Sequence, residues 1–185
     1  IIYTIKIMFP DNKDFETWST RELINYVLEY HHPIGRRRGH VLLNQARQTL
    51  EAAGAQRHIV EKIVAEMEIS IPDLDSHFDR EEAVLFPYLI ELCTAEENKQ
   101  RIEAFHCGTI LNPIHVMMNE HAMEQDRYGY LETLTDNFTA PAEATEAYRN
   151  LLADLKTFVT ALREHIRLEN DFVFPQATEL EAQWA

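Results

Sequence analysis

Apolar residues recur with helical spacing over most of the chain. Ser19 and Glu22 have the spacing of a capping box, which marks the start of a helix. The apolar positions after it share one helix face: Leu23, Ile24, Val27 and Leu28. This first predicted helix runs to Gly54 and is bent, because Pro33 and Gly35 interrupt its pattern.

Three more helical patterns come after the first. The second runs from about residue 56 to residue 92, with kinks expected at Pro72 and Pro87. The third begins at Pro113, where a proline suits the first helical turn, and the fourth runs from Pro141 to the region of Pro175. No convincing strand lies between them. The pattern therefore predicts an all-α fold, an antiparallel four-helix bundle.

The first residues do not join this pattern. Residues 1–13 alternate loosely and break at Pro10, which is typical of either a short strand or a tail. We divide the chain into residues 1–18, an N-terminal tail or the remnant of a removed segment, and residues 19–185, the bundle domain. The chain begins with Ile1, so we expect the native start to lie upstream.

Composition narrows the classes of function. The chain has 185 residues with 17 Lys and Arg against 31 Asp and Glu, and a net charge of −14 repels nucleic acid. No apolar run approaches the roughly 18 residues that a membrane span needs. The two cysteines, Cys93 and Cys107, cannot build a disulfide framework or a four-thiolate metal site. We expect a cytoplasmic protein that binds neither nucleic acid nor membrane.

One motif occurs twice and carries the candidate chemistry. Segments 77–87 and 165–175 share the pattern His-x3-Glu-x4-Phe-Pro. Residues four apart lie about 40° from each other on a helix face, so both side chains can reach one ion from the same side. The two pairs are His77 with Glu81, and His165 with Glu169.

Two single histidines match this repeat. His32 precedes the first motif by 45 residues and His121 precedes the second by 44, so each half of the chain supplies one lone His and one pair. Four imidazoles and two carboxylates in an apolar core are unfavourable unless cations neutralise them. Without thiolates this donor set suits Fe, Zn, Cu or Mn, and two carboxylates from opposing helices can bridge two ions. Six protein donors leave coordination positions open for a small ligand.

Other polar residues receive plainer interpretations. A single His-x3-Glu pair is usually an exposed polar pair on a helix. Only its repetition favours the interpretation of the pairs as metal ligands. His31 points about 100° away from His32 and is the alternative donor from the first helix. His40, His106 and His115 lack matched partners, and the basic run 36–38 is typical of a solvated face. The cysteines are expected to be buried and structural, rather than thiols that trap nitric oxide.

At these residues the chain resembles the hemerythrin-like (HHE) domains, and more closely the ScdA/RIC (repair of iron centres) family of di-iron proteins. The resemblance covers about residues 18–181 and is carried by Trp18-x4-Leu23-Ile24, His31-His32, His77-x3-Glu81-Glu82, Leu85-Phe86-Pro87-Tyr88, Gly108-Thr109, Asn112-Pro113-Ile114, Met117-Met118-x-Glu120-His121 and His165-Ile166-x-Leu168-Glu169-Asn170. It implies two irons, with His32, His77, His121 and His165 as terminal ligands and Glu81 and Glu169 as bridges.

The chain departs from this family in two places. The family usually has a further His near the end of the first helix, where this chain has Ala53 before Gly54. Either His58 substitutes for that ligand, or water or an exogenous ligand fills the position, which is the alternative we favour. The family's small N-terminal domain, with its cysteines, is absent from this sequence.

Three functions are compatible with the sequence. The resemblance implies a di-iron protein of nitrosative and oxidative stress that repairs damaged iron-sulfur clusters, with iron-sulfur proteins as clients and nitric oxide reduction as a further activity. A carrier or sensor of oxygen or nitric oxide would use the same open positions without turnover. A helical interaction domain without metal is the third. Iron content excludes the third, and turnover separates the first two.

Overall fold

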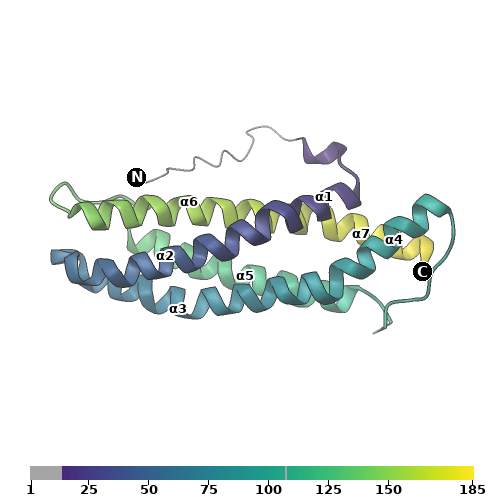
Figure 1. The fold of residues 1–185 in the computed structure, drawn as a ribbon, viewed down its shortest axis with the longest axis horizontal. Coiled ribbons are helices and arrows are strands. Elements are labelled where there is room, and N and C mark those ends of the chain that lie inside the picture. Colours follow the sequence, from purple (N-terminus) through teal and green to yellow (C-terminus); the bar gives the residue numbers. More distant parts are fainter. Residues whose placement is uncertain (1–13, 107) are drawn as a thin grey trace.

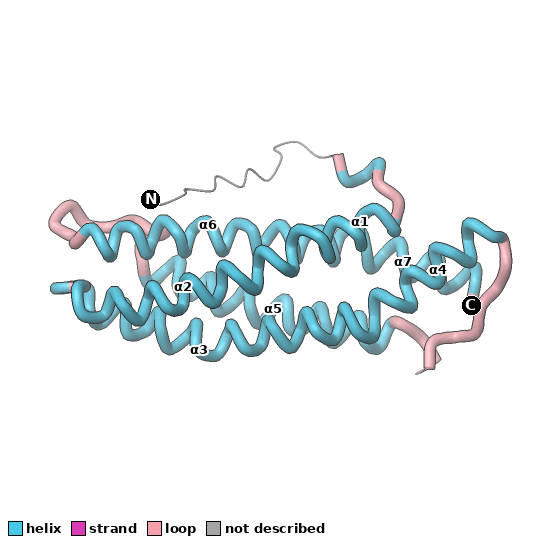
Figure 2. Tube along the Cα trace, in the orientation of Figure 1, coloured by secondary structure: helices cyan, strands magenta, loops and turns pink. Residues whose placement is uncertain are grey.

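The computed structural model, which describes residues 14–106 and 108–185, is a bundle of long antiparallel helices (Figure 1). The helices are α1 Thr20–Tyr26, α2 His32–Ala52, α3 Arg57–Arg80, α4 Phe86–Asn98, α5 Leu111–Leu134, α6 Glu146–Leu168 and α7 Phe174–Trp184. The described residues form no strand (Figure 2), so the predicted all-α bundle is confirmed. The strand or tail predicted for residues 1–13 lies outside the described residues.

The seven α-helices of the described residues make up four long helices of the bundle: α1–α2, α3–α4, α5 and α6–α7. Three of these long helices contain one wide π turn each. These turns, Val27–His31, Glu81–Leu85 and Glu169–Val173, join α1 to α2, α3 to α4 and α6 to α7. Each turn precedes a helix with proline in its first turn: Pro33, Pro87 and Pro175. Proline lacks an N–H and clashes with the carbonyl four residues back, and a wide turn relieves both problems. Pro72, where a kink was also expected, lies inside the continuous α3.

The packed part of the chain extends further than the sequence predicted in three places. α7 continues past Pro175 because Ala177 and Leu180 are buried on its inner face. α4 runs to Asn98, past the predicted end at about residue 92. Near the start of the chain, Phe15 is buried, and its ring centre lies 5.9 Å from that of Tyr26 and 6.2 Å from that of Phe172. The last part of the predicted tail is therefore packed against the domain.

Two apolar clusters fill the bundle and leave the predicted site between them. One is formed mainly by α2, α3, α5 and α6, and includes Met67 and Leu155. The other is formed mainly by α1, α4, α7 and the start of α5, and includes Leu89 and Phe174. The π turns lie where the two clusters meet, so polar side chains at these turns are shielded on both sides.

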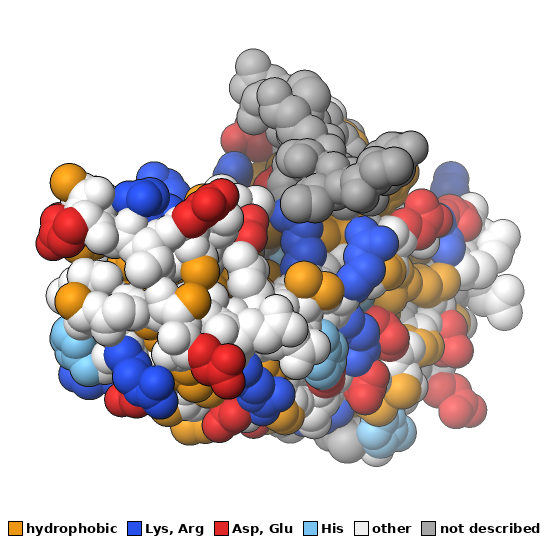
Figure 3. Space-filling view, turned by 60° about the vertical axis from the view of Figure 1, so that its left-hand side comes forward, with side chains coloured by type: hydrophobic (Ala, Val, Ile, Leu, Met, Phe, Trp, Pro, Cys, Tyr) orange, Lys and Arg blue, Asp and Glu red, His pale blue; other side chains and the backbone are white. Residues whose placement is uncertain are grey.

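The surface carries charges of both signs. On the face drawn in Figure 3, acidic and basic side chains alternate instead of gathering into patches of one sign. Arg36, from the basic run, pairs with three carboxylates, those of Asp75, Asp79 and Glu82. Arg36 is therefore engaged with the protein's own acids. None of the described helices is both long and apolar enough to cross a bilayer.

Candidate metal centre

The structure brings the six predicted donors together in the middle of the bundle. They come from all four long helices and are each 3% exposed or less: His32, His77, Glu81, His121, His165 and Glu169. Their donor atoms form two overlapping groups within 4.8 Å, His77–His121–His165–Glu169 and His32–Glu81–His165–Glu169. Two neighbouring positions are thus available to cations.

The two carboxylates lie between imidazoles of different helices. Glu169 Oε2 is 3.1 Å from His121 Nε2 and 3.4 Å from His165 Nε2, and its Oε1 is 3.8 Å from His32 Nε2. Glu81 Oε2 is 3.3 Å from His32 Nε2 and 3.4 Å from His77 Nε2. Each Glu therefore faces imidazoles of more than one helix, which is the position that a bridging carboxylate needs.

Three of the imidazoles are fixed from behind by a neighbouring helix. Nδ1 of His32 lies 2.8 Å from Glu82, Nδ1 of His77 lies 2.7 Å from Glu120, and Nδ1 of His121 lies 2.9 Å from Asn170. In each case Nδ1–H donates to an oxygen, which leaves the Nε2 lone pair directed at the site. Metal-binding histidines are commonly held in this way. We call the oxygen that accepts from Nδ1–H the outer acceptor, and its bond makes Nε2 a better electron-pair donor to a metal.

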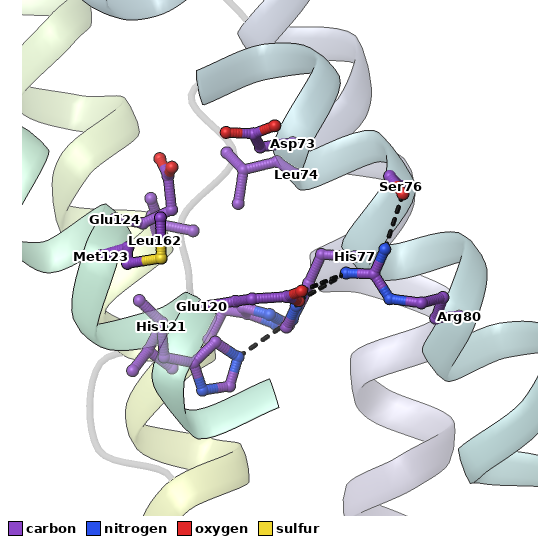
Figure 4. Close-up of a pocket in the computed structure, with 12 residues that line it drawn as sticks. Asp73, Leu74, Ser76, His77, Arg80, Glu120, His121, Met123, Glu124 and Leu162 are labelled. Atoms are coloured by element: carbon purple, nitrogen blue, oxygen red, sulfur yellow. Dashed lines mark hydrogen bonds and ion pairs between the residues drawn. The ribbon is translucent and has the colours of Figure 1, made fainter. Parts of the chain in front are cut away.

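Arginines complete two of these arrangements. Arg36 donates to Glu82 over 3.2 Å, and Arg80 donates to both carboxylate oxygens of Glu120, the longer contact being 2.6 Å (Figure 4). These charge-assisted bonds hold the outer carboxylates in place. Glu120 accordingly has a lowered pKa, because its bonds to His77 and Arg80 outweigh partial burial.

Sequence reasoning gave no role to the three outer acceptors. A signal was present, because each is the chain neighbour of a donor: Glu82 follows Glu81, Glu120 precedes His121, and Asn170 follows Glu169. Such a neighbour points about 100° away from its donor, towards the next helix of the bundle.

In the metal-free protein, burial shifts the pKa of every donor in the direction that favours its neutral form. Burial lowers the pKa of His32 to about 3 and of His77 to about 4, and it lowers the pKa of His121 and His165 as well. Burial raises the pKa of both carboxyls well above the ordinary value, and for Glu81 the nearby Glu169 raises it further. Neutral imidazoles are ready to bind a metal, whereas protonated carboxyls must first lose a proton.

The donor set fits a pair of divalent cations. None of the four carboxylate oxygens of Glu81 and Glu169 has a hydrogen-bond partner among the described residues, although both side chains are fully buried. Buried carboxylates without partners are strongly unfavourable, and cations between them and the Nε2 atoms would satisfy both. Nitrogen and oxygen donors without sulfur suit iron, among other transition metals.

A cavity of about 200 Å³ connects the donors with the bundle surface. His77, His121 and His165 contribute to its wall, together with Glu120, Glu124 and Met123. Figure 4 shows Glu124 and Met123 across the cavity from Arg80. A diatomic molecule could therefore reach the imidazole side of the cluster from between α3 and α5.

The structure corrects the expectation for Ala53 and His58. α2 is continuous from His32 to Ala52, so Ala53 lies about 31 Å along the helix from the site. His58, at the start of α3, is exposed and lies about 28 Å along that helix from His77. The end of α2 and the start of α3 lie together at one end of the bundle, away from the donors in its middle (Figure 1). No ligand position exists at Ala53, and His58 cannot substitute for a ligand.

The remaining candidates lie outside the two donor groups. His31 is buried beside the cluster, with its ring centre 5.8 Å from that of His165, but it belongs to neither group. His40 is exposed and contacts Asp75 over 2.8 Å, and His106 and His115 are exposed. Burial raises the pKa of the Cys93 thiol to about 11, so this cysteine is structural. Cys107 lies outside the described residues.

Metal binding is expected to release protons. Because the pKa values of both carboxyls are raised, the metal-free site holds protons that the cations displace, and metal affinity should fall as the pH is lowered from 8 to 6. Calorimetry in two buffers of different ionisation enthalpy counts the protons. Glu169→Gln should release about one proton fewer. Equal affinity at both pH values with no proton release would contradict this.

Comparison with known proteins agrees with this geometry. The family described as hemerythrin HHE cation binding domain matches residues 23–177. A relative from Musicola paradisiaca (strain Ech703), named iron-sulfur cluster repair protein YtfE, is 30% identical over 94% of this chain and 72% of its own length. Proteins of the same name from Yersinia pestis (strain Pestoides F) and Yersinia pseudotuberculosis (serotype O:3, strain YPIII) are each 26% identical over 90% of this chain and 69% of their own length.

Proposed function

This chain belongs to the hemerythrin HHE cation-binding domain family, and from that premise we propose that it is a di-iron protein that repairs damaged iron-sulfur clusters by donating iron. The family accounts for cation binding, and the relatives' names supply the task. One observation supports the proposal most: two fully buried carboxylates without hydrogen-bond partners among the described residues face four imidazole nitrogens.

In this proposal each residue type has a separate task. His32, His77, His121 and His165, together with Glu81 and Glu169, would hold the irons. The outer acceptors orient three of the imidazoles, and the two apolar clusters exclude bulk water from the donors. Bound ferrous iron supplies exchangeable positions for nitric oxide or oxygen, and it is also the cargo.

The proposal includes the proteins that receive the iron and the compartment in which the protein acts. Iron-sulfur proteins are the acceptors of the donated iron, and the reducing cytosol is where such damage is repaired and where a chain with two cysteines is stable without disulfides. The net charge of −14 supports the expectation that nucleic acid is not a partner.

The cavity favours a second candidate function. An opening that reaches three imidazoles would also serve a carrier or sensor of oxygen or nitric oxide. Both candidates need iron and an open position. They differ in the fate of the bound gas and of the iron, because a carrier or sensor releases the gas unchanged and keeps its metal.

One anaerobic experiment separates the candidates. Iron-loaded protein is mixed with an iron-sulfur enzyme damaged by nitric oxide, and recovered activity, iron transfer and nitrous oxide are monitored together. Recovery with iron transfer is the expected result, and nitrous oxide production would add a reductase activity. Reversible gas binding without recovery or turnover would favour the carrier or sensor instead.

A further inference from the structure

His165 differs from the other three donor imidazoles. Nδ1 of His32, His77 and His121 each bonds to an oxygen of the next helix. Nδ1 of His165 has no hydrogen-bond partner among the described residues, although its side chain is only 4% exposed. One of the four imidazoles is therefore not held from behind by the protein.

The space behind His165 explains this difference. A cavity of about 20 Å³ adjoins the ring; apolar residues such as Ile34 and Phe78 line it together with His31 and Arg38, and His165 Nδ1 has no hydrogen bond to any of them. A cavity of this size has room for about one water molecule. The outer partner of His165 is then at most a water, which exchanges more readily than a side chain fixed in a helix.

The four imidazoles divide into two pairs. His77 Nε2 and His121 Nε2 are 3.0 Å apart, so they converge on one position, and both rings are held by outer acceptors. His165 belongs to both donor groups, but its ring centre lies nearer to that of His32, at 5.3 Å, than to those of His121 and His77, at 5.9 and 6.4 Å. The second position would therefore be held by His32, which has an outer acceptor, and by His165, which has none.

We propose that the two irons are held unequally and that the iron bound by His32 and His165 is released first. This inference rests on the proposed di-iron function and identifies which iron is the cargo. Loss of an outer acceptor typically weakens metal binding by about 10- to 100-fold, so release of the two irons should differ by a factor in this range.

Rapid mixing of the anaerobic diferrous protein with excess ferrous chelator tests the proposal. Two phases of equal amplitude are expected, with rates about 10- to 100-fold apart. Release of both irons in a single phase would overturn the proposal. The assay contains no client, so failure of cluster repair leaves its result intact, whereas binding of fewer than two irons would refute the proposed function itself.

Two matched variants show which iron is which. Glu82→Gln weakens the acceptor of His32 and should accelerate only the fast phase, while Asn170→Ala removes the acceptor of His121 and should accelerate only the slow phase, each by about 10-fold. Both residues are partly exposed, and circular dichroism checks that the variants fold. Acceleration of the slow phase by Glu82→Gln, or of the fast phase by Asn170→Ala, would overturn the assignment.

Discussion

Replacing either buried carboxylate, as Glu81→Ala or Glu169→Ala, is expected to reduce bound iron from two ions per chain to fewer than one. Each carboxylate faces imidazoles of two or more helices, so its loss removes a donor from both positions. It also removes the negative charge that offsets two cations in an apolar core. We expect iron affinity to fall by more than about 100-fold, since even an outer acceptor contributes 10- to 100-fold.

His40→Ala and His115→Ala are the matched controls. Both residues are exposed and lie outside the donor groups, so both variants should retain two irons. Iron is measured by elemental analysis after anaerobic, iron-supplied purification of all four variants. Equal iron content in the Glu variants and the controls would show that the ligand assignment is wrong.

Iron loading is expected to raise the melting temperature by about 15–30 °C. At a free iron concentration 1,000-fold above the dissociation constant, each site stabilises the folded state by about 4 kcal/mol. Two sites give about 8 kcal/mol, and for a domain of this size each kcal/mol raises the melting temperature by roughly 2–4 °C. Calorimetry with iron, without iron and after addition of chelator measures the shift and its reversal.

The variant Glu169→Leu should separate stability from binding. In the metal-free protein this carboxyl is fully buried and has a raised pKa caused by burial, so an apolar side chain should stabilise the fold by about 1–4 kcal/mol. Iron should then give little further stabilisation. A metal-free variant less stable than the parent would mean that the carboxyl stabilises the fold by itself.

Much of the site was predictable because helix geometry is regular. The His-x3-Glu spacing places two side chains on one face in any α-helix, so His77 with Glu81 and His165 with Glu169 needed no tertiary information. The matched positions of His32 and His121 indicated which other helices take part. The structure brings all six side chains within one cluster.

Features that depend on contacts between helices were not predictable in this way. The outer acceptors Glu82, Glu120 and Asn170 are ordinary polar residues until the packing shows which imidazole each one meets. The prolines predicted bends, but the accommodation of each bend by a π turn depends on the continued packing of both flanking segments.

The error at Ala53 has a simple physical origin. A sequence motif places a residue by its position along the chain, whereas a ligand is defined by its position in space. Because α2 is one unbroken helix from His32 to Ala52, each residue lies about 1.5 Å further along it from the site. Counting this rise along the helix excludes both Ala53 and His58 without any further information.

The most direct test of a two-metal site in the bundle core is the iron content of the protein purified without oxygen from iron-supplied cells, measured together with its Mössbauer spectrum. We predict two irons per chain and two distinct iron environments, because the two donor groups differ in their imidazoles. No more than trace metal would contradict the account, and a single zinc per chain would leave the fold intact but exclude the di-iron centre.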